Sequence, residues 1–147
     1  MNLDIIHDYS TASRNTFVSF LKNGPIEMKI LCLSKIKMAF KEVDGDRDFA
    51  SWAIKLLVSQ INVVTRVTEL IVDILYCNTK RLTHLNILIK CLIEYKQQAI
   101  PLLARLEAAR PLIYRLITTE EGFKMFEDND HYVMREFQYF MVRVSLY

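Results

Sequence analysis

The stretch Val63-Val64-Thr65-Arg66-Val67-Thr68-Glu69-Leu70-Ile71-Val72-Asp73-Ile74-Leu75 decides the fold class. Its apolar side chains recur at steps of three and four residues, which is the spacing of one face of an α-helix. β-branched residues are frequent in it and favour a strand, but strict alternation fails and the run is too long for an ordinary strand. It therefore predicts an amphipathic helix that comes after a break at Asn62 and carries the stripe Val63, Val64, Val67, Leu70, Ile71, Ile74 and Leu75.

Toward the N-terminus, the same periodicity predicts three more helices. The first begins its apolar pattern at Thr16 and ends at Asn23-Gly24-Pro25, because glycine suits the position after a helix and proline cannot continue it. Pro25 can equally open the next helix, whose stripe is Ile26, Ile30, Leu33, Ile36 or Lys37, and Phe40. The acidic turn Asp44-Gly45-Asp46 comes next, and a third helix is then marked by Phe49, Trp52, Ala53, Leu56 and Leu57.

Toward the C-terminus, capping residues and prolines divide the chain into shorter helices. Asn78 or Thr79 is expected to cap a helix carrying Leu82, Leu85, Leu88, Ile89 and Leu92. Pro101 and Pro111 interrupt the next part of the chain, so one helix is expected from about Leu102 and another from Pro111 itself.

Two further helices are predicted beyond this point. Thr118 and Glu121 have the spacing of a capping box, in which a hydroxyl meets a free amide while the carboxylate reaches back, and this opens a short helix. A last helix presents Val133, Phe137, Phe140, Met141 and Val144 on one face.

The expected fold is therefore all-α, with about seven or eight helices in residues 1–147, taken as a single domain. Only three glycines and three prolines are present, so long helices with short connections account for the chain. Three helices between Phe49 and Tyr95 occupy about the length of one armadillo-type repeat. We expect an armadillo/HEAT-like helical array, with a compact orthogonal helical bundle as the alternative.

Composition excludes several classes of function. Nineteen basic and 17 acidic residues leave a formal net charge of +2, without the basic stripe that nucleic-acid binding requires. Apolar runs are too short for a membrane span, and the N-terminus does not resemble a signal peptide. Cys32, Cys77 and Cys91 are widely spaced and flanked by apolar residues, so they are expected to be buried, unpaired thiols.

Catalytic and metal-binding patterns are also missing from the sequence. His7, His84 and His131 are isolated, and the adjacent Glu120 and Glu121 point in different directions on a helix. The glycines are too far apart to form a phosphate-binding loop. We therefore expect no enzyme, no catalytic residue, no cofactor and no metal site.

Aromatic residues near the C-terminus have the chemistry of an interaction surface. Phe137, Phe140 and Trp52 lie on apolar stripes and are expected in the core. Tyr132, Tyr139 and Tyr147 fall off the stripe, so we expect them at the surface, where aromatic side chains are frequent binding residues.

Two stretches carry a family resemblance. They are Phe49-Ala50-Ser51-Trp52-Ala53-Ile54-Lys55-Leu56-Leu57-Val58-Ser59-Gln60 and Arg115-Leu116-Ile117-Thr118-Thr119-Glu120-Glu121-Gly122-Phe123. Together they resemble paired motifs of the Rictor/Pianissimo family, and the similarity covers about residues 48–137. The chain departs from the family pattern at Ile61-Asn62-Val63, Lys96-Gln97-Gln98 and Arg105-Leu106-Glu107, which indicates a divergent member.

This resemblance implies a function and a role for each motif residue. It implies a non-catalytic scaffold segment of TOR complex 2 that binds the TOR kinase and other subunits, in the cytoplasm, with membrane association through the assembled complex. Trp52 and Phe123 would fill seams between helices, Gly122 would permit a close approach, and Arg115 would bind helix-end carbonyls or pair with Glu120 or Glu121. The implied structural residues are Phe49, Trp52, Gln60, Arg115, Thr118, Thr119, Gly122 and Phe123. The alternative function is a free-standing helical adaptor that binds a partner helix in an apolar groove.

Overall fold

The computed structural model describes residues 11–43, 46–129 and 135, and in these residues it contains helices and no strand. The all-α prediction is confirmed. The helices are α1 (Thr11–Asn23), α2 (Ile26–Glu42), α3 (Arg47–Ser59), α4 (Thr65–Asn78), α5 (Leu82–Glu94), α6 (Ala99–Arg105), the 3-10 helix η1 (Glu107–Ala109), α7 (Arg110–Leu116) and α8 (Glu120–Asn129). The predicted last helix and the tyrosines Tyr132, Tyr139 and Tyr147 lie outside the described residues.

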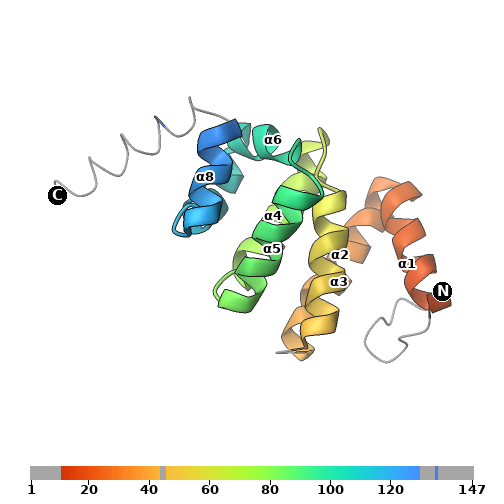
Figure 1. Cartoon of the computed structure of the whole chain (residues 1–147). Helices are drawn as coiled ribbons and strands as arrows, with labels where there is room; N and C mark the ends of the chain where they lie inside the picture. The colour runs from red at the N-terminus through yellow and green to blue at the C-terminus, as the bar shows by residue number, and fades with distance from the viewer. Residues whose placement is uncertain (1–10, 44–45, 130–134, 136–147) are drawn as a thin grey trace.

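The helices stack in two layers. Helix α2 packs on α4 and α4 on α7, while α3 packs on α5 and α5 on α8. Figure 1 shows α3 and α5 side by side, with α1 and α8 at opposite ends of the described helices. A closed bundle would bring these two helices together, whereas here the helices between them keep them apart. The structure is therefore the helical array that the sequence predicts.

The core lies between the two layers. It consists of aliphatic and aromatic side chains that the helices present at steps of three and four residues, so each helix buries one stripe. On α3, Phe49, Ala53 and Leu57 are all at most 1% exposed, and on α4 the same holds for Ile71 and Val72. Because these stripes belong to neighbouring helices of the stack, one continuous core runs from α1 to α8.

The start of α4 differs from the prediction. Val63 and Val64, expected on its apolar stripe, are 81% and 46% exposed and precede the helix, which begins at Thr65. The cause is local hydrogen bonding by Asn62, whose Oδ1 accepts from the Val64 amide at 2.8 Å while the Thr68 hydroxyl donates to its carbonyl at 2.7 Å. An Asx turn of this kind competes with the first helical turn, so the chain stays non-helical until Thr65.

The link between α4 and α5 also corrects the prediction. Asn78 and Thr79 do not cap α5, which begins at Leu82. Instead they close the end of α4, because Asn78 Nδ2 donates to the Ile74 carbonyl and the Thr79 hydroxyl donates to the Tyr76 carbonyl, both at 2.8 Å. These bonds add side-chain donors to carbonyls in the last turns of α4.

Prolines shift two helix starts relative to the prediction. Helix α6 begins at Ala99, ahead of Pro101, rather than at Leu102, and α7 begins at Arg110, one residue ahead of Pro111. Amides in the first turn of a helix have no intrahelical partner, so a proline there costs no hydrogen bond. Of the three cysteines, which are all unpaired, Cys32 and Cys91 are buried as expected, but Cys77 is exposed.

Candidate functional site

The first motif holds α3 against its neighbours through aromatic contacts. Phe49 is buried and meets Phe40 of α2 edge to face, with ring centroids 5.2 Å apart. Trp52 is half-buried between Phe49 and Phe17 of α1, at centroid distances of 5.9 and 6.1 Å. The Arg14 guanidinium lies over the Trp52 ring, 5.1 Å from its centroid. These rings join α1, α2 and α3 at one end of the array.

The first motif ends at Gln60, where α3 ends. Its amide donates to the Leu57 carbonyl at 3.0 Å, and its side-chain Nε2 donates to the Ser59 hydroxyl at 3.2 Å. The carbonyls of Ser59 and Ile61 accept from Lys96 Nζ at 2.8 and 2.7 Å. A lysine from the segment after α5 therefore closes the end of α3.

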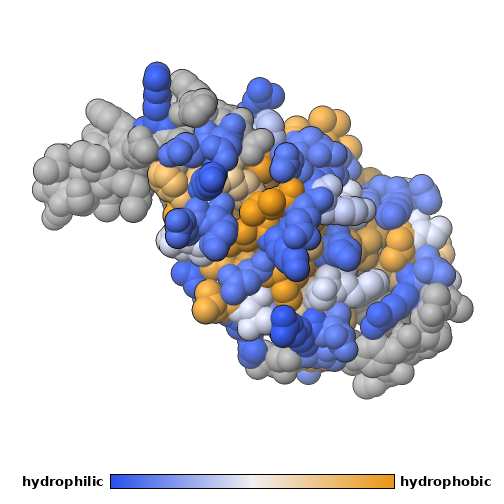
Figure 2. All heavy atoms as spheres, viewed as in Figure 1, coloured by the Kyte–Doolittle hydropathy of each residue, from blue (hydrophilic) through white to orange (hydrophobic). Residues whose placement is uncertain are grey.

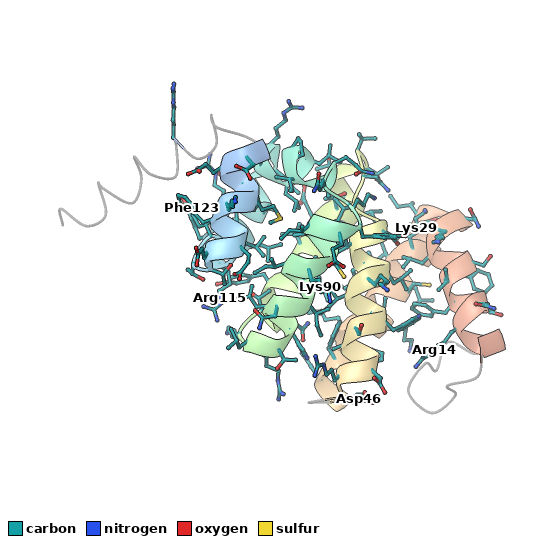
Figure 3. The ribbon with its side chains drawn as sticks, viewed as in Figure 1. Arg14, Lys29, Asp46, Lys90, Arg115 and Phe123 are labelled. Carbon is teal, nitrogen blue, oxygen red and sulfur yellow. The ribbon has the colours of Figure 1, made fainter. Side chains whose placement is uncertain are left out.

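The second motif closes the end of another helix in the same way. Arg115, in the last turn of α7, donates from Nε to the Thr79 carbonyl at the end of α4, at 3.2 Å. Among the described residues it forms no ion pair with Glu120 or Glu121. Lys29 of α2 donates likewise to the Lys22 carbonyl at the end of α1, at 2.8 Å. We call Lys29, Lys96 and Arg115 the cation caps; Figure 3 shows Lys29 and Arg115 toward opposite ends of the molecule.

The cation caps reflect the electrostatics of helix ends. Carbonyls in the last turn have no intrahelical partner and carry the negative end of the helix dipole, so a cation there is favourable. Burial lowers the pKa of Lys96, because the charged ammonium is removed from water. Lys29 and Lys96 are not predicted from the sequence, since the Lys96 partners lie 35 and 37 residues earlier and leave no local signal.

Helix α8 is capped by Thr119, one residue after the predicted cap Thr118. Thr119 Oγ1 accepts from the Gly122 amide at 3.0 Å, whereas the Thr118 hydroxyl donates backwards to the Arg115 carbonyl at 2.6 Å. The cap is thus Thr119, and the residue three positions on is Gly122, so the predicted capping box with Glu121 does not form. Glycine is needed at this third helical position for a steric reason, because a Cβ at Gly122 would lie 2.0 Å from the Leu116 carbonyl oxygen.

The motif residues do not converge on one site. Phe123 is half-buried against the core on α8, and in Figure 3 it lies far from Arg14, which marks the position of Trp52. In the part of the chain that the structure describes, no group of His, Cys, Asp and Glu is placed to hold a metal ion. No described helix has the length and apolar character needed to cross a membrane. These residues form joints between helices.

Helices α3, α5 and α8 form one surface, which we call the grooved face. Two neighbouring grooves lie on it. The α3/α5 groove, of about 480 Å³, is lined by Arg47, Ser51, Lys55, Ile87, Lys90, Cys91, Glu94 and Tyr95. The α5/α8 groove consists of two hollows of about 350 and 280 Å³ that share Ile93 and Glu121. Figure 2 shows hydrophilic residues over this face with hydrophobic patches between them. Open grooves with charged rims suit protein partners better than small molecules, which favour enclosed apolar pockets.

Comparison with known proteins gives the family. The family model of the rapamycin-insensitive companion of mTOR RasGEF_N domain matches residues 48–143. The chain belongs to this family. The match begins in the first turn of α3, at the residue where the predicted Rictor resemblance begins, and it extends six positions beyond the predicted end at 137. No curated protein and no solved structure matches the chain. In this Rictor-family chain, α1 and α2 precede the matched region.

Proposed function

We propose that the chain is a non-catalytic scaffold segment of a Rictor-like subunit of TOR complex 2, where it supports assembly with the TOR kinase and the positioning of substrates. The observation that carries the proposal is the family match over residues 48–143, which spans α3 to α8. The rapamycin-insensitive companion of mTOR is named for its association with that kinase. We also propose that residues 1–147 act as one unit in the cytoplasm and reach membranes through the assembled complex.

The geometry of the array supports a scaffold role. A scaffold has to hold surfaces at fixed positions, and the described ends of α1, α3 and α4 are each closed by a cation from another element. Catalysis requires convergent titratable groups, and the polar motif residues Arg115, Thr118 and Thr119 bind backbone atoms instead. The motif residues therefore have a structural role in this proposal, and Tyr132, Tyr139 and Tyr147 are proposed contact residues.

The grooved face favours one second candidate, a free-standing adaptor that binds a partner helix. Its α5/α8 groove has Ile89, Ile93 and Met125 among its lining residues, which would accept the apolar face of a helix. An adaptor of this kind works without the TOR complex, so the two candidates differ in the proteins that bind the chain in its cell.

Size-exclusion chromatography of a native lysate separates these candidates. The scaffold role predicts that the chain elutes together with the TOR kinase, far ahead of the position of a 17.3 kDa protein. Elution of all the chain as a small species, with the TOR kinase in separate fractions, would refute the scaffold role and favour the adaptor.

A further inference from the structure

The α3/α5 groove concentrates positive charge. Arg47, Ser51 and Lys55 succeed one another at four-residue steps along α3, so they form one ridge of that helix. Lys90 stands on the opposite wall, on α5, and Figure 3 shows it near the middle of the grooved face. Against these three cations, the lining contains a single carboxylate, that of Glu94.

Charged groups of both walls act on Cys91, which lines the same groove. Burial has the largest effect on the Cys91 thiol and raises its pKa; Lys55 and Lys90 lower this pKa by smaller amounts, and Glu94 raises it by a smaller amount. Three charges from α3 and α5 therefore act on the same buried thiol at the floor of the groove. No ion pair with another described residue engages Arg47, Lys55 or Lys90.

The floor of the groove is apolar. Ile87 is half-buried and Cys91 is buried, while Tyr95 is 57% exposed at the end of α5. An exposed tyrosine beside a hydrophobic floor offers contact area at low entropic cost and is frequent at binding hot spots. A matching partner would combine apolar side chains for the floor with negative charge for the walls.

The neighbouring groove has a different charge. The α5/α8 groove is lined by the carboxylates of Glu94, Glu121 and Asp128, against the ammonium groups of Lys90 and Lys124. The positive charge is therefore a property of the α3/α5 groove rather than of the whole grooved face. Electrostatic complementarity of this kind selects partners and speeds their association.

We propose that the α3/α5 groove binds an acidic segment of a protein partner, with its carboxylates between the Lys55 and Lys90 walls and its apolar side chains on Ile87 and Tyr95. The inference rests on the proposed protein-binding role and names the chemistry of one partner.

Binding of a defined acidic peptide to the purified chain tests this inference. The probe is a fluorescein-labelled peptide of about twelve residues, Glu at most positions and Leu at every third or fourth, which as a helix spans about 18 Å. We expect saturable binding by fluorescence anisotropy, with NMR amide shifts confined to α3 and α5. A matched peptide with Lys in place of Glu should not bind.

Charge reversal in the chain supplies the decisive comparison. Lys55→Glu with Lys90→Glu should weaken peptide binding at least about tenfold, and the milder Lys55→Gln with Lys90→Gln should weaken it less. The control reverses two exposed lysines of α2, Lys35→Glu with Lys41→Glu, which should change affinity less than about twofold. Equal weakening by the α2 control, or no saturable binding by the unaltered chain, would overturn the inference.

Glu94 provides a variant of opposite sign. Glu94→Gln removes the one carboxylate of the groove, so acidic peptide binding should tighten, while a variant that merely disturbed the fold would weaken it. Unchanged or weaker binding by Glu94→Gln would count against the assigned groove. The assay contains no TOR component, so its outcome stands apart from the elution test of the scaffold role.

Discussion

At the scale of single residues, Gly122 is the described glycine that lies closest to neighbouring backbone. Any side chain there would place its Cβ 2.0 Å from the Leu116 carbonyl oxygen, and that atom belongs to rigid backbone. Gly122→Ala should therefore lower the free energy of unfolding by about 2 kcal/mol or more, measured by urea denaturation. The exposed neighbour Lys124→Ala should change it by less than about 0.5 kcal/mol. Equal effects of the two changes would contradict this close approach.

Thr119 and Thr118 form a matched pair of adjacent threonines with different partners. Thr119 accepts from the Gly122 amide at the start of α8, so Thr119→Ala should cost about 1 kcal/mol, as the loss of a helix cap does. Thr118 is exposed and donates to a carbonyl that water can also reach, so Thr118→Ala should cost less. Thermal unfolding of both variants ranks them, and a larger loss for Thr118→Ala would restore the predicted capping box.

Lys96 is the cation cap with a pH signature. Lys96→Met leaves the Ser59 and Ile61 carbonyls without their donor and should cost about 1–3 kcal/mol, whereas the exposed Gln98→Met should be nearly neutral. Burial holds the folded-state pKa of Lys96 below its ordinary value of 10.5. Between these two pKa values the unfolded chain binds more protons, so stability gained from this residue rises with pH across that window.

Comparison of two proteins isolates the Lys96 contribution. The difference in unfolding free energy between the unaltered chain and Lys96→Met should grow as the pH rises toward 10.5, because other groups titrate in both proteins and cancel. Urea denaturation at a series of alkaline pH values measures it. A difference that shrinks over this range would show that the ammonium is more stable in the folded chain than in the unfolded chain.

At the scale of helices, packing between layers outweighs surface ion pairs. Leu57 is fully buried on α3, so Leu57→Ala should lower stability by about 2–5 kcal/mol. The Lys37–Asp73 ion pair joins α2 to α4 at 2.8 Å, but its side chains are 43% and 53% exposed. Asp73→Asn should therefore cost less than about 1 kcal/mol, and less still in high salt. Chemical denaturation of both variants checks the order, which a larger loss for Asp73→Asn would reverse.

The helices show how far local sequence specifies this fold. Apolar periodicity predicts α2, α3, α4 and α5. Each helix buries one stripe, and the residues of that stripe recur in the sequence at steps of three and four. Helix starts are less well predicted, as Val63 and Val64 show, since the side chain of Asn62 decides where α4 begins. Of the cation caps, only Arg115 is expected, from the family resemblance; Lys29 and Lys96 are not predicted, because Lys96 and its acceptors come together only when α3 and α5 have packed.

At the scale of the whole molecule, the residues that hold the helices together differ from the residues that line the grooves. The motif residues Phe49, Trp52 and Arg115 face neighbouring helices, so they specify how the layers stack. The charged rims of the grooved face are exposed, and no described stacking contact depends on them. Sequence motifs therefore reveal the family, while the candidate binding groove arises only from the side-by-side packing of α3 and α5. Its positive ridge, spaced at four residues on α3, is present in the sequence, but the sequence does not show the second wall.

Membership in a TOR complex can be measured by affinity purification of the tagged chain from its native cell, followed by mass spectrometry. Membership predicts recovery of the TOR kinase with the other subunits of complex 2. Gly122→Ala, which disturbs the close approach of α8 to Leu116, should reduce that recovery. The exposed Lys124→Ala variant serves as the control and should retain the kinase. Reproducible recovery of the bait without any TOR component would contradict membership.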